Sequence, residues 1–197
     1  MRPAALGLAL LLGAPPAAAP DLVDAEKTVP GLVVELRYAQ ADNAFHQAFY
    51  PKDARCLLLR PVAARLRRAA QAVEAQGYRL KVWDCYRPLA VQWAMWAAVP
   101  RRGYVADPHT GSHHNRAAAV DVTLVRPDGT PVEMPTPFDT FGPAARHDAP
   151  VKAEVAARRA LLRTAMEEAG FRKNRMEWWH YEAPEAHGAP ILDVPLD

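Results

Sequence analysis

Two polar segments that lie far apart in this 197-residue chain constrain its fold more than any other feature. The first carries His114 and Asp121 in a His-x6-Asp pattern, and the second carries Glu177 and His180 in Glu-Trp-Trp-His. Two imidazoles and one carboxylate form a ligand set that suits Zn²⁺ and leaves one coordination position for water. A further carboxylate beside such a site can accept that water's proton. We therefore expect His114, Asp121 and His180 to bind Zn²⁺ with Glu177 next to them, as in a zinc hydrolase.

The four side chains can reach one site only if the backbone of each segment has a particular local structure. The alternation over residues 119–124 predicts a strand with Asp121 on the face opposite its valines, pointing into a site. Residues at i and i+3 share one face of a helical turn but lie on opposite faces of a strand. Glu177 and His180 can therefore reach one metal only if the chain turns or bulges at Trp178-Trp179. A single histidine is more often a surface or hydrogen-bonded residue, and His113 is an alternative ligand to His114.

The remaining pattern predicts one α+β domain with a small, mostly antiparallel sheet flanked by helices, because strands and helices do not alternate regularly. Residues 42–53 are expected to form a loop. A second, long loop is expected from the turn at Pro127-Asp128-Gly129 to Pro150. Strands are predicted over residues 32–36, 79–84 and 119–124, and helices over residues 57–76, 89–99 and 153–169, the first and last followed by Gly77 and Gly170.

The first 19 residues resemble a secretory signal peptide, which leaves residues 20–197 as the mature domain. Arg2 precedes an apolar run, and Ala17-Ala18-Ala19 offers small residues for cleavage. The run is shorter than the roughly 20 residues that a membrane-spanning helix needs. We expect an exported protein, periplasmic or secreted, with no membrane attachment in the mature form; a buried N-terminal helix is the alternative.

Export affects how Cys56 and Cys85, the two cysteines of the chain, are interpreted. In an oxidising compartment two thiols favour one disulfide. Two free buried thiols are the alternative.

The charge balance argues against nucleic acid as a partner. The chain has 24 basic and 22 acidic side chains, a formal net charge of +2, and its basic doublets are scattered. Nothing in the sequence predicts the oligomeric state.

Arg87 follows a predicted strand in the segment Asp-Cys-Tyr-Arg-Pro. A cation at a strand end beside a polar cleft can stabilise the oxyanion of a tetrahedral intermediate. The alternative is a surface salt bridge.

The combination of Tyr86-Arg87-Pro88, Ser112-x-His114-x6-Asp121 and Glu177-Trp178-Trp179-His180 resembles the D-alanyl-D-alanine dipeptidases. These are zinc enzymes of the wider D,D-peptidase and hedgehog-like fold group. The likeness includes Arg37-Tyr38-Ala39-x-x-Asp42-Asn43 and Pro137-Phe138-Asp139 and spans roughly residues 35 to 182. It implies one Zn²⁺ per chain and hydrolysis of a small D,D-dipeptide from cell-wall peptidoglycan into two D-alanines.

The resemblance also implies roles for individual residues. Glu177 would be the general base and Arg87 would stabilise the oxyanion. Ser112 would help to hold the substrate carboxylate, and Tyr38 and Asp139 would bind the free amino group.

The resemblance leaves two alternatives and one departure from the family pattern. A peptidoglycan D,D-carboxypeptidase or endopeptidase could use the same metal centre, and a zinc-binding module could lack catalysis altogether. The family usually has Gly where this chain has Ala117. If that position requires a positive φ, Ala would strain the loop by roughly 1 kcal/mol.

Overall fold

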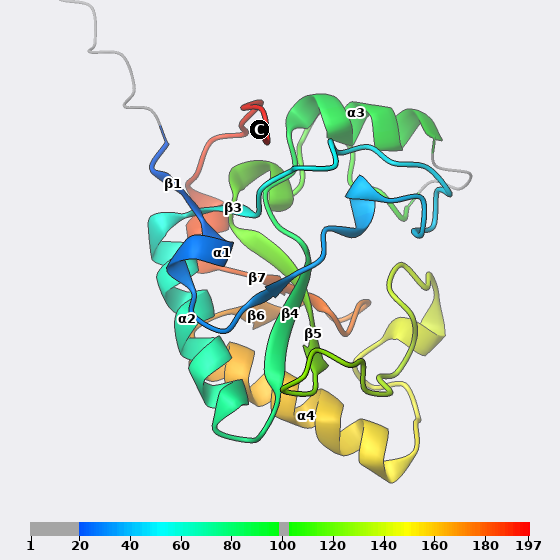
Figure 1. The fold of residues 1–197 in the computed structure, drawn as a ribbon. Coiled ribbons are helices and arrows are strands. Elements are labelled where there is room, and N and C mark those ends of the chain that lie inside the picture. The colour runs from blue at the N-terminus through cyan, green and yellow to red at the C-terminus, as the bar shows by residue number, and fades with distance from the viewer. Residues whose placement is uncertain (1–19, 99–102) are drawn as a thin grey trace, which may run out of the picture.

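A five-stranded sheet lies at the centre of the molecule (Figure 1). The computed structural model describes residues 20–98 and 103–197, so the predicted signal peptide, residues 1–19, lies outside the described residues. The pairs β4–β5, β5–β7 and β6–β7 are antiparallel and β2–β4 is parallel, which confirms the predicted mostly antiparallel sheet. The strand order is β2 (Val33–Val34), β4 (Arg79–Asp84), β5 (Ala119–Val125), β7 (His180–Glu182) and β6 (Arg172–Lys173).

Two long helices, α2 (Arg60–Glu74) and α4 (Ala153–Glu168), contact each other and the central strands. The shorter α3 (Leu89–Ala98) lies at the opposite end of the molecule from α4 in Figure 1. The predicted helical spacing of α2 is confirmed, because Val62, Leu66 and Val73 are buried on one face. Helix α4 also agrees with its prediction to within one residue. The molecule is therefore α+β, as expected.

The predicted helix over residues 57–76 begins too early. Leu57–Leu59 instead forms β3, which pairs antiparallel with β1 (Leu22–Asp24) in a separate two-stranded sheet. A short apolar run does not distinguish a strand from a buried helix, and Pro61 at the first turn of α2 marks where the helix begins. The short helices that complete the fold are α1 (Ala25–Thr28), η1 (Arg37–Ala39), η2 (His114–Arg116), η3 (Pro143–Ala145) and η4 (Pro184–His187).

The central strands are predicted well from the sequence. Strand β4 has its predicted bounds, and β5 extends one residue further than expected. The expected strand over residues 32–36 is regular only at Val33–Val34, although the Glu35 amide still donates to the Val82 carbonyl at 3.0 Å. All seven residues of β5 are buried, so its polar side chains lie inside the protein and not in solvent.

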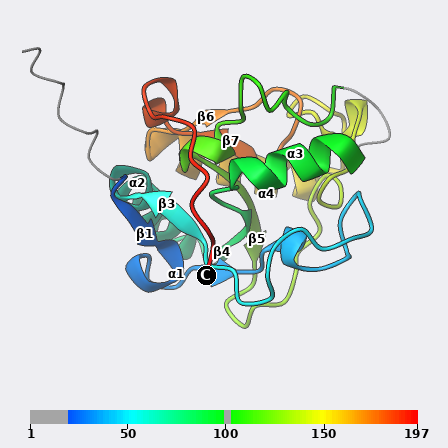
Figure 2. The same cartoon turned by 90° about the horizontal axis from the view of Figure 1, so that it is seen from above.

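A disulfide and the C-terminal segment connect elements that lie far apart in the sequence. Cys56, just before β3, is bonded to Cys85, just after β4, with Cα atoms 5.3 Å apart, which confirms the predicted pairing. The C-terminal segment runs between β3 and α3 (Figure 2), and its Leu196 carbonyl accepts a hydrogen bond from the Arg55 amide at 3.0 Å. Across the described ranges 20–98 and 103–197, no helix has the length and apolar character needed to cross a membrane.

Candidate metal centre and substrate cavity

The three predicted metal ligands lie together at the centre of the sheet. Asp121 on β5 is directly opposite His180 on β7 in the antiparallel pairing. His114 is the first residue of η2, the short helix that precedes β5. Strand pairing thus joins the two polar segments, and all three side chains are almost fully buried.

The spacing of the side-chain atoms fits a metal ion. His114 Nε2 is 3.1 Å from His180 Nδ1, and His180 Nδ1 is 2.9 Å from Asp121 Oδ1. His114 Nε2 is 3.4 Å from Asp121 Oδ1. Tetrahedral ligands with metal bonds of about 2.0–2.1 Å lie about 3.3 Å apart. These residues could therefore hold a metal ion.

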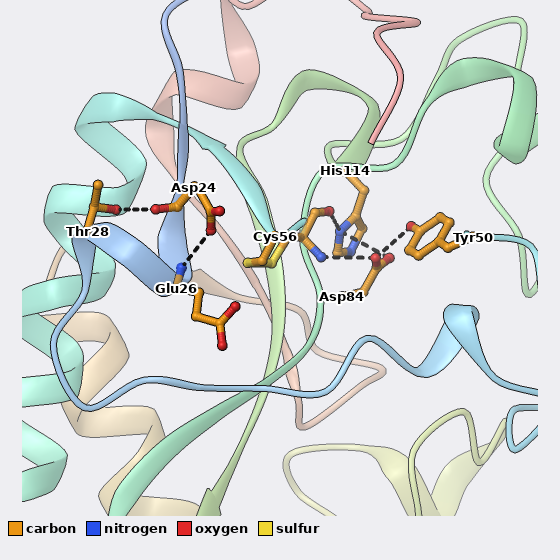
Figure 3. The surroundings of a disulfide bond; sticks show 8 residues. Asp24, Glu26, Thr28, Tyr50, Cys56, Asp84 and His114 are labelled. Carbon is orange, nitrogen blue, oxygen red and sulfur yellow. Dashed lines mark hydrogen bonds and ion pairs between the residues drawn. A yellow bond between two sulfur atoms is a disulfide. The ribbon is translucent and has the colours of Figure 1, made fainter. Parts of the chain in front are cut away.

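Hydrogen bonds orient both imidazoles toward the space between the three ligand atoms. His114 Nδ1 lies 2.6 Å from the Cys85 carbonyl, which makes Nδ1 the protonated nitrogen and leaves Nε2 free to bind a metal. Figure 3 shows His114 beside the disulfide, with Asp84 facing both His114 and Tyr50. Burial acts to lower the pKa of His180, but the neighbouring carboxylates of Asp121, Glu182 and Glu177 together outweigh burial and raise the pKa to about 10. The cluster thus favours positive charge.

Glu177 precedes the predicted ligand His180 by one turn of the chain. The predicted turn at Trp178-Trp179 is confirmed, with the His180 amide 3.3 Å from the Glu177 carbonyl and both tryptophans buried. Asn174 Nδ2 is 3.4 Å from Glu177 Oε2. Burial raises the pKa of the Glu177 carboxyl group above its ordinary value. A carboxylate that attracts protons more strongly is suited to general base catalysis.

Arg87 is buried and not in a surface salt bridge. Its Nη2 and Nε atoms donate to Asp84 Oδ2 at 2.5 and 3.2 Å, and its Nη1 donates to Gln92 Oε1 at 2.9 Å. Its guanidinium carbon also lies 5.1 Å from the centre of the Tyr38 ring. A guanidinium group has five N–H bonds, so two remain for another acceptor.

The residues expected to bind substrate lie nearby. Tyr38 donates a hydrogen bond from its hydroxyl to Asp139 Oδ1 at 3.0 Å. Burial raises the pKa of Asp139 to about 7, with a further contribution from the charge of Asp121. Ser112 accepts a hydrogen bond from the His114 amide through its hydroxyl at 3.2 Å, so it also supports the metal-site loop.

One cavity of about 390 Å³ brings these groups together. Its wall includes every residue that the sequence predicted for metal binding, catalysis or substrate binding. Those lining residues are Tyr38, Arg87, Ser112, His114, Asp121, Asp139, Glu177 and His180. The cavity can therefore present a ligand to a metal ion, a carboxylate and a guanidinium group at once.

The structure also resolves the choice between the two adjacent histidines. His113 lies outside the three-residue cluster, with its Nδ1 2.9 Å from Glu182 Oε2. The imidazoles of His113 and His180 beside it hold the pKa of Glu182 well below its usual range. Sequence reasoning did not identify Glu182, Asp84 or Gln92. For Asp84 and Glu182 the available signal was their position, three residues before Arg87 and two residues after His180.

Ala117 adopts the left-handed conformation that its position suggested. It has φ 52° and ψ 33°, directly after η2, and its side chain is fully buried. The left-handed turn ends the short helix and directs the chain into β5. The strain expected for Ala at this position is therefore present in the loop that carries His114.

Comparisons with known proteins identify a family and several relatives that match most of the chain. The model of the Peptidase M15 family, described as D-ala-D-ala dipeptidase, matches residues 18–196. The chain is 36% identical over 173 residues to the D-alanyl-D-alanine dipeptidase of Escherichia coli (strain K12), covering 87% of this chain and 89% of that protein. It is 35% identical over 159 residues to that of Enterococcus faecium, with 68% and 77% covered. Identity to the Streptomyces coelicolor enzyme is 31% over 204 residues, with 89% and 98% covered.

Proposed function

Since the chain belongs to the Peptidase M15 family of D-Ala-D-Ala dipeptidases, a family of metallopeptidases, we propose that it hydrolyses the D-alanyl-D-alanine dipeptide to two D-alanines with one Zn²⁺ per chain. One observation carries this proposal. His114, Asp121 and His180 place their ligand atoms within 3.4 Å of one another in the wall of a cavity that Glu177 and Arg87 also line. Two imidazoles and one carboxylate match the donor set of catalytic zinc sites.

The proposed chemistry divides between the ion and the protein. A Zn²⁺ ion held by these residues supplies Lewis acidity, which makes water a usable nucleophile near neutral pH. The Glu177 carboxylate accepts a proton from the attacking water. Protonated Glu177 then delivers that proton to the amine nitrogen that leaves. The raised pKa of Glu177 favours both transfers, because the group must bind and release a proton within one turnover.

Arg87 stabilises the charge that develops on the scissile carbonyl oxygen. Its contacts with Asp84 and Gln92 fix the guanidinium plane before substrate arrives. A donor that is already oriented needs no reorganisation during the reaction, which is why such groups lower barriers effectively.

Tyr38 and Asp139 provide selectivity for a free dipeptide. An ammonium group is buried at low cost only beside a carboxylate, and Asp139 places its carboxylate in the cavity wall, hydrogen-bonded to Tyr38. A peptide extended at its amino end would leave Asp139 unpaired and lose that interaction. Ser112, which also lines the cavity, is assigned to the substrate carboxylate.

The test compares D-alanine release from D-Ala-D-Ala and from a muramyl pentapeptide that ends in the same pair, with and without Zn²⁺. We expect zinc-dependent cleavage of the free dipeptide alone. Cleavage of the pentapeptide would indicate a D,D-carboxypeptidase and refute the roles of Tyr38 and Asp139. Zinc binding without cleavage of either substrate would indicate a binding module.

A variant pair tests the catalytic assignment. Glu177→Gln should retain zinc and lose turnover by about 10²–10⁴-fold, the usual contribution of a general base. Glu168→Gln removes the same charge from an exposed position on α4 and should leave turnover unchanged. A near-normal rate in Glu177→Gln would remove Glu177 from this role.

We also propose that the protein is exported and that residues 1–19 are removed as a signal peptide. The Cys56–Cys85 disulfide supports this proposal, because stable disulfides are typical of oxidising compartments. N-terminal sequencing of the protein from cell fractions would test it, and an intact N-terminus on cytoplasmic protein would contradict it.

A further inference from the structure

The two consecutive histidines of the metal-site loop face different partners. His114 contributes Nε2 to the three-residue cluster. His113 instead directs Nδ1 at Glu182 Oε2, at 2.9 Å. The proposed catalytic chemistry uses His114 and assigns no role to His113 or Glu182.

Glu182 lies beside His180 because of the geometry of β7. Side chains of a strand alternate between its two faces, so His180 and Glu182 share one face and Tyr181 lies on the other. The second oxygen of Glu182, Oε1, is 3.6 Å from His180 Nε2. One carboxylate thus faces His113 with one oxygen and His180 with the other.

This arrangement matters for how His180 would bind a metal. Its Nδ1 atom points toward His114 and Asp121, so Nε2 is the nitrogen that must carry the proton. A carboxylate beside Nε2 stabilises that tautomer, orients the ring and makes the ligand more basic. At 3.6 Å the contact is electrostatic and longer than a hydrogen bond, so it depends on where the carboxylate is held.

His113 supplies that restraint. The Glu182 side chain is 27% exposed, and without a partner it would exchange among rotamers in contact with solvent. The 2.9 Å contact with His113 Nδ1 restricts the carboxylate through Oε2, the oxygen that does not face His180. The loop that supplies one ligand thereby also positions the residue that orients another.

We propose that Glu182 is a positioning residue for the metal ligand His180, and that His113 holds Glu182 in place. This inference rests on the proposed metal site. It assigns a function to both members of the His113-His114 pair, one as a ligand and one as the support of a second ligand's partner.

The test measures Zn²⁺ affinity by competition with a chelator, in the full mature chain. Glu182→Ala should weaken binding by about 10- to 100-fold, the usual effect of removing such a partner. Glu182→Gln should have a smaller effect, because its amide oxygen can still accept a hydrogen bond. His113→Ala should also weaken binding, and adding it to Glu182→Ala should have no further effect, because His113 acts through Glu182.

Two controls separate positioning from general damage. Glu168→Ala and His109→Ala alter exposed residues of the same types and should leave zinc affinity unchanged. Circular dichroism melting of the metal-free variants should show that each remains folded. Because the assay measures binding, its result does not depend on peptidase activity.

Zinc affinity of Glu182→Ala within about twofold of the parent would overturn the inference while leaving the metal site intact. A strictly additive double variant would refute the role of His113 as the support of Glu182. A parent protein that binds no Zn²⁺ would overturn both this inference and the proposed metal site.

Discussion

Asp84→Asn should destabilise the fold and disorganise the catalytic cavity, because Asp84 is a fully buried carboxylate with four hydrogen-bond donors around it. Its Oδ1 accepts from the Tyr50 hydroxyl at 2.7 Å and from the Cys85 amide at 2.9 Å. Its Oδ2 accepts from Arg87 Nη2 and Nε at 2.5 and 3.2 Å. Asparagine can keep the first two interactions through its oxygen. Its amide nitrogen then faces two donors of Arg87 and cannot replace the others.

The loss of unfolding free energy in Asp84→Asn can be estimated from those contacts. Two charge-assisted hydrogen bonds at roughly 1.5–3 kcal/mol each give a loss of about 3–6 kcal/mol. Breaking a buried ion pair on one side typically costs about 3–5 kcal/mol, which agrees. We therefore expect the free energy of unfolding to fall by about 3–5 kcal/mol. Tyr50→Phe removes one donor and leaves the ion pair intact, so it should cost about 1–2 kcal/mol.

Urea unfolding with the disulfide intact measures this effect, with Asp128→Asn as an exposed control. Turnover of the folded variant should also fall, because Arg87 would no longer be held in one plane. A loss of less than about 1 kcal/mol would refute the reasoning, since it would mean that Arg87 reaches other acceptors without cost. Normal turnover would show that Asp84 does not position Arg87.

Three further predictions follow from other parts of the structure. Because burial raises the pKa of Asp139 to about 7 and the group must be ionised to bind an ammonium, kcat/KM should rise with pH through about 7. Asp139→Asn should abolish that limb, and an unchanged profile would contradict the assignment. Ala117→Gly relieves about 1 kcal/mol of strain but loses a buried methyl worth about 0.8 kcal/mol and gains unfolded-state entropy, so stability measured by urea unfolding should change by less than about 1 kcal/mol. Reduction of Cys56–Cys85, which closes a separation of 29 residues, should lower the unfolding free energy by about 3–4 kcal/mol, and an unchanged midpoint in reductant would refute this.

The sequence predicts the central elements because their patterns are long and consistent. Strand β4 and helix α4 are recovered almost to the residue, since alternating residues begin the strand and a glycine, Gly170, follows the helix closely. Strand β3 is missed, because its three leucines fit a strand and a helix equally well. Only its pairing with β1 decides between them, and that pairing depends on a distant segment.

The residues of the site also differ in how readily the sequence reveals them. His114, Asp121, Glu177 and His180 can be proposed from the sequence, because metal binding and proton transfer admit few side-chain types. The roles of Asp84 and Glu182 depend on their positions beside Arg87 and His180 in the folded chain. Any nearby carbonyl or carboxylate can orient an imidazole, and His114 uses the Cys85 backbone for this purpose, which no side-chain pattern reveals. Glu182 can be recognised only after β7 is known to place it on the face of His180. The ligands are thus constrained by chemistry and their supports by topology, so substitutions at the supports should alter affinity and rate in a graded way and not abolish them.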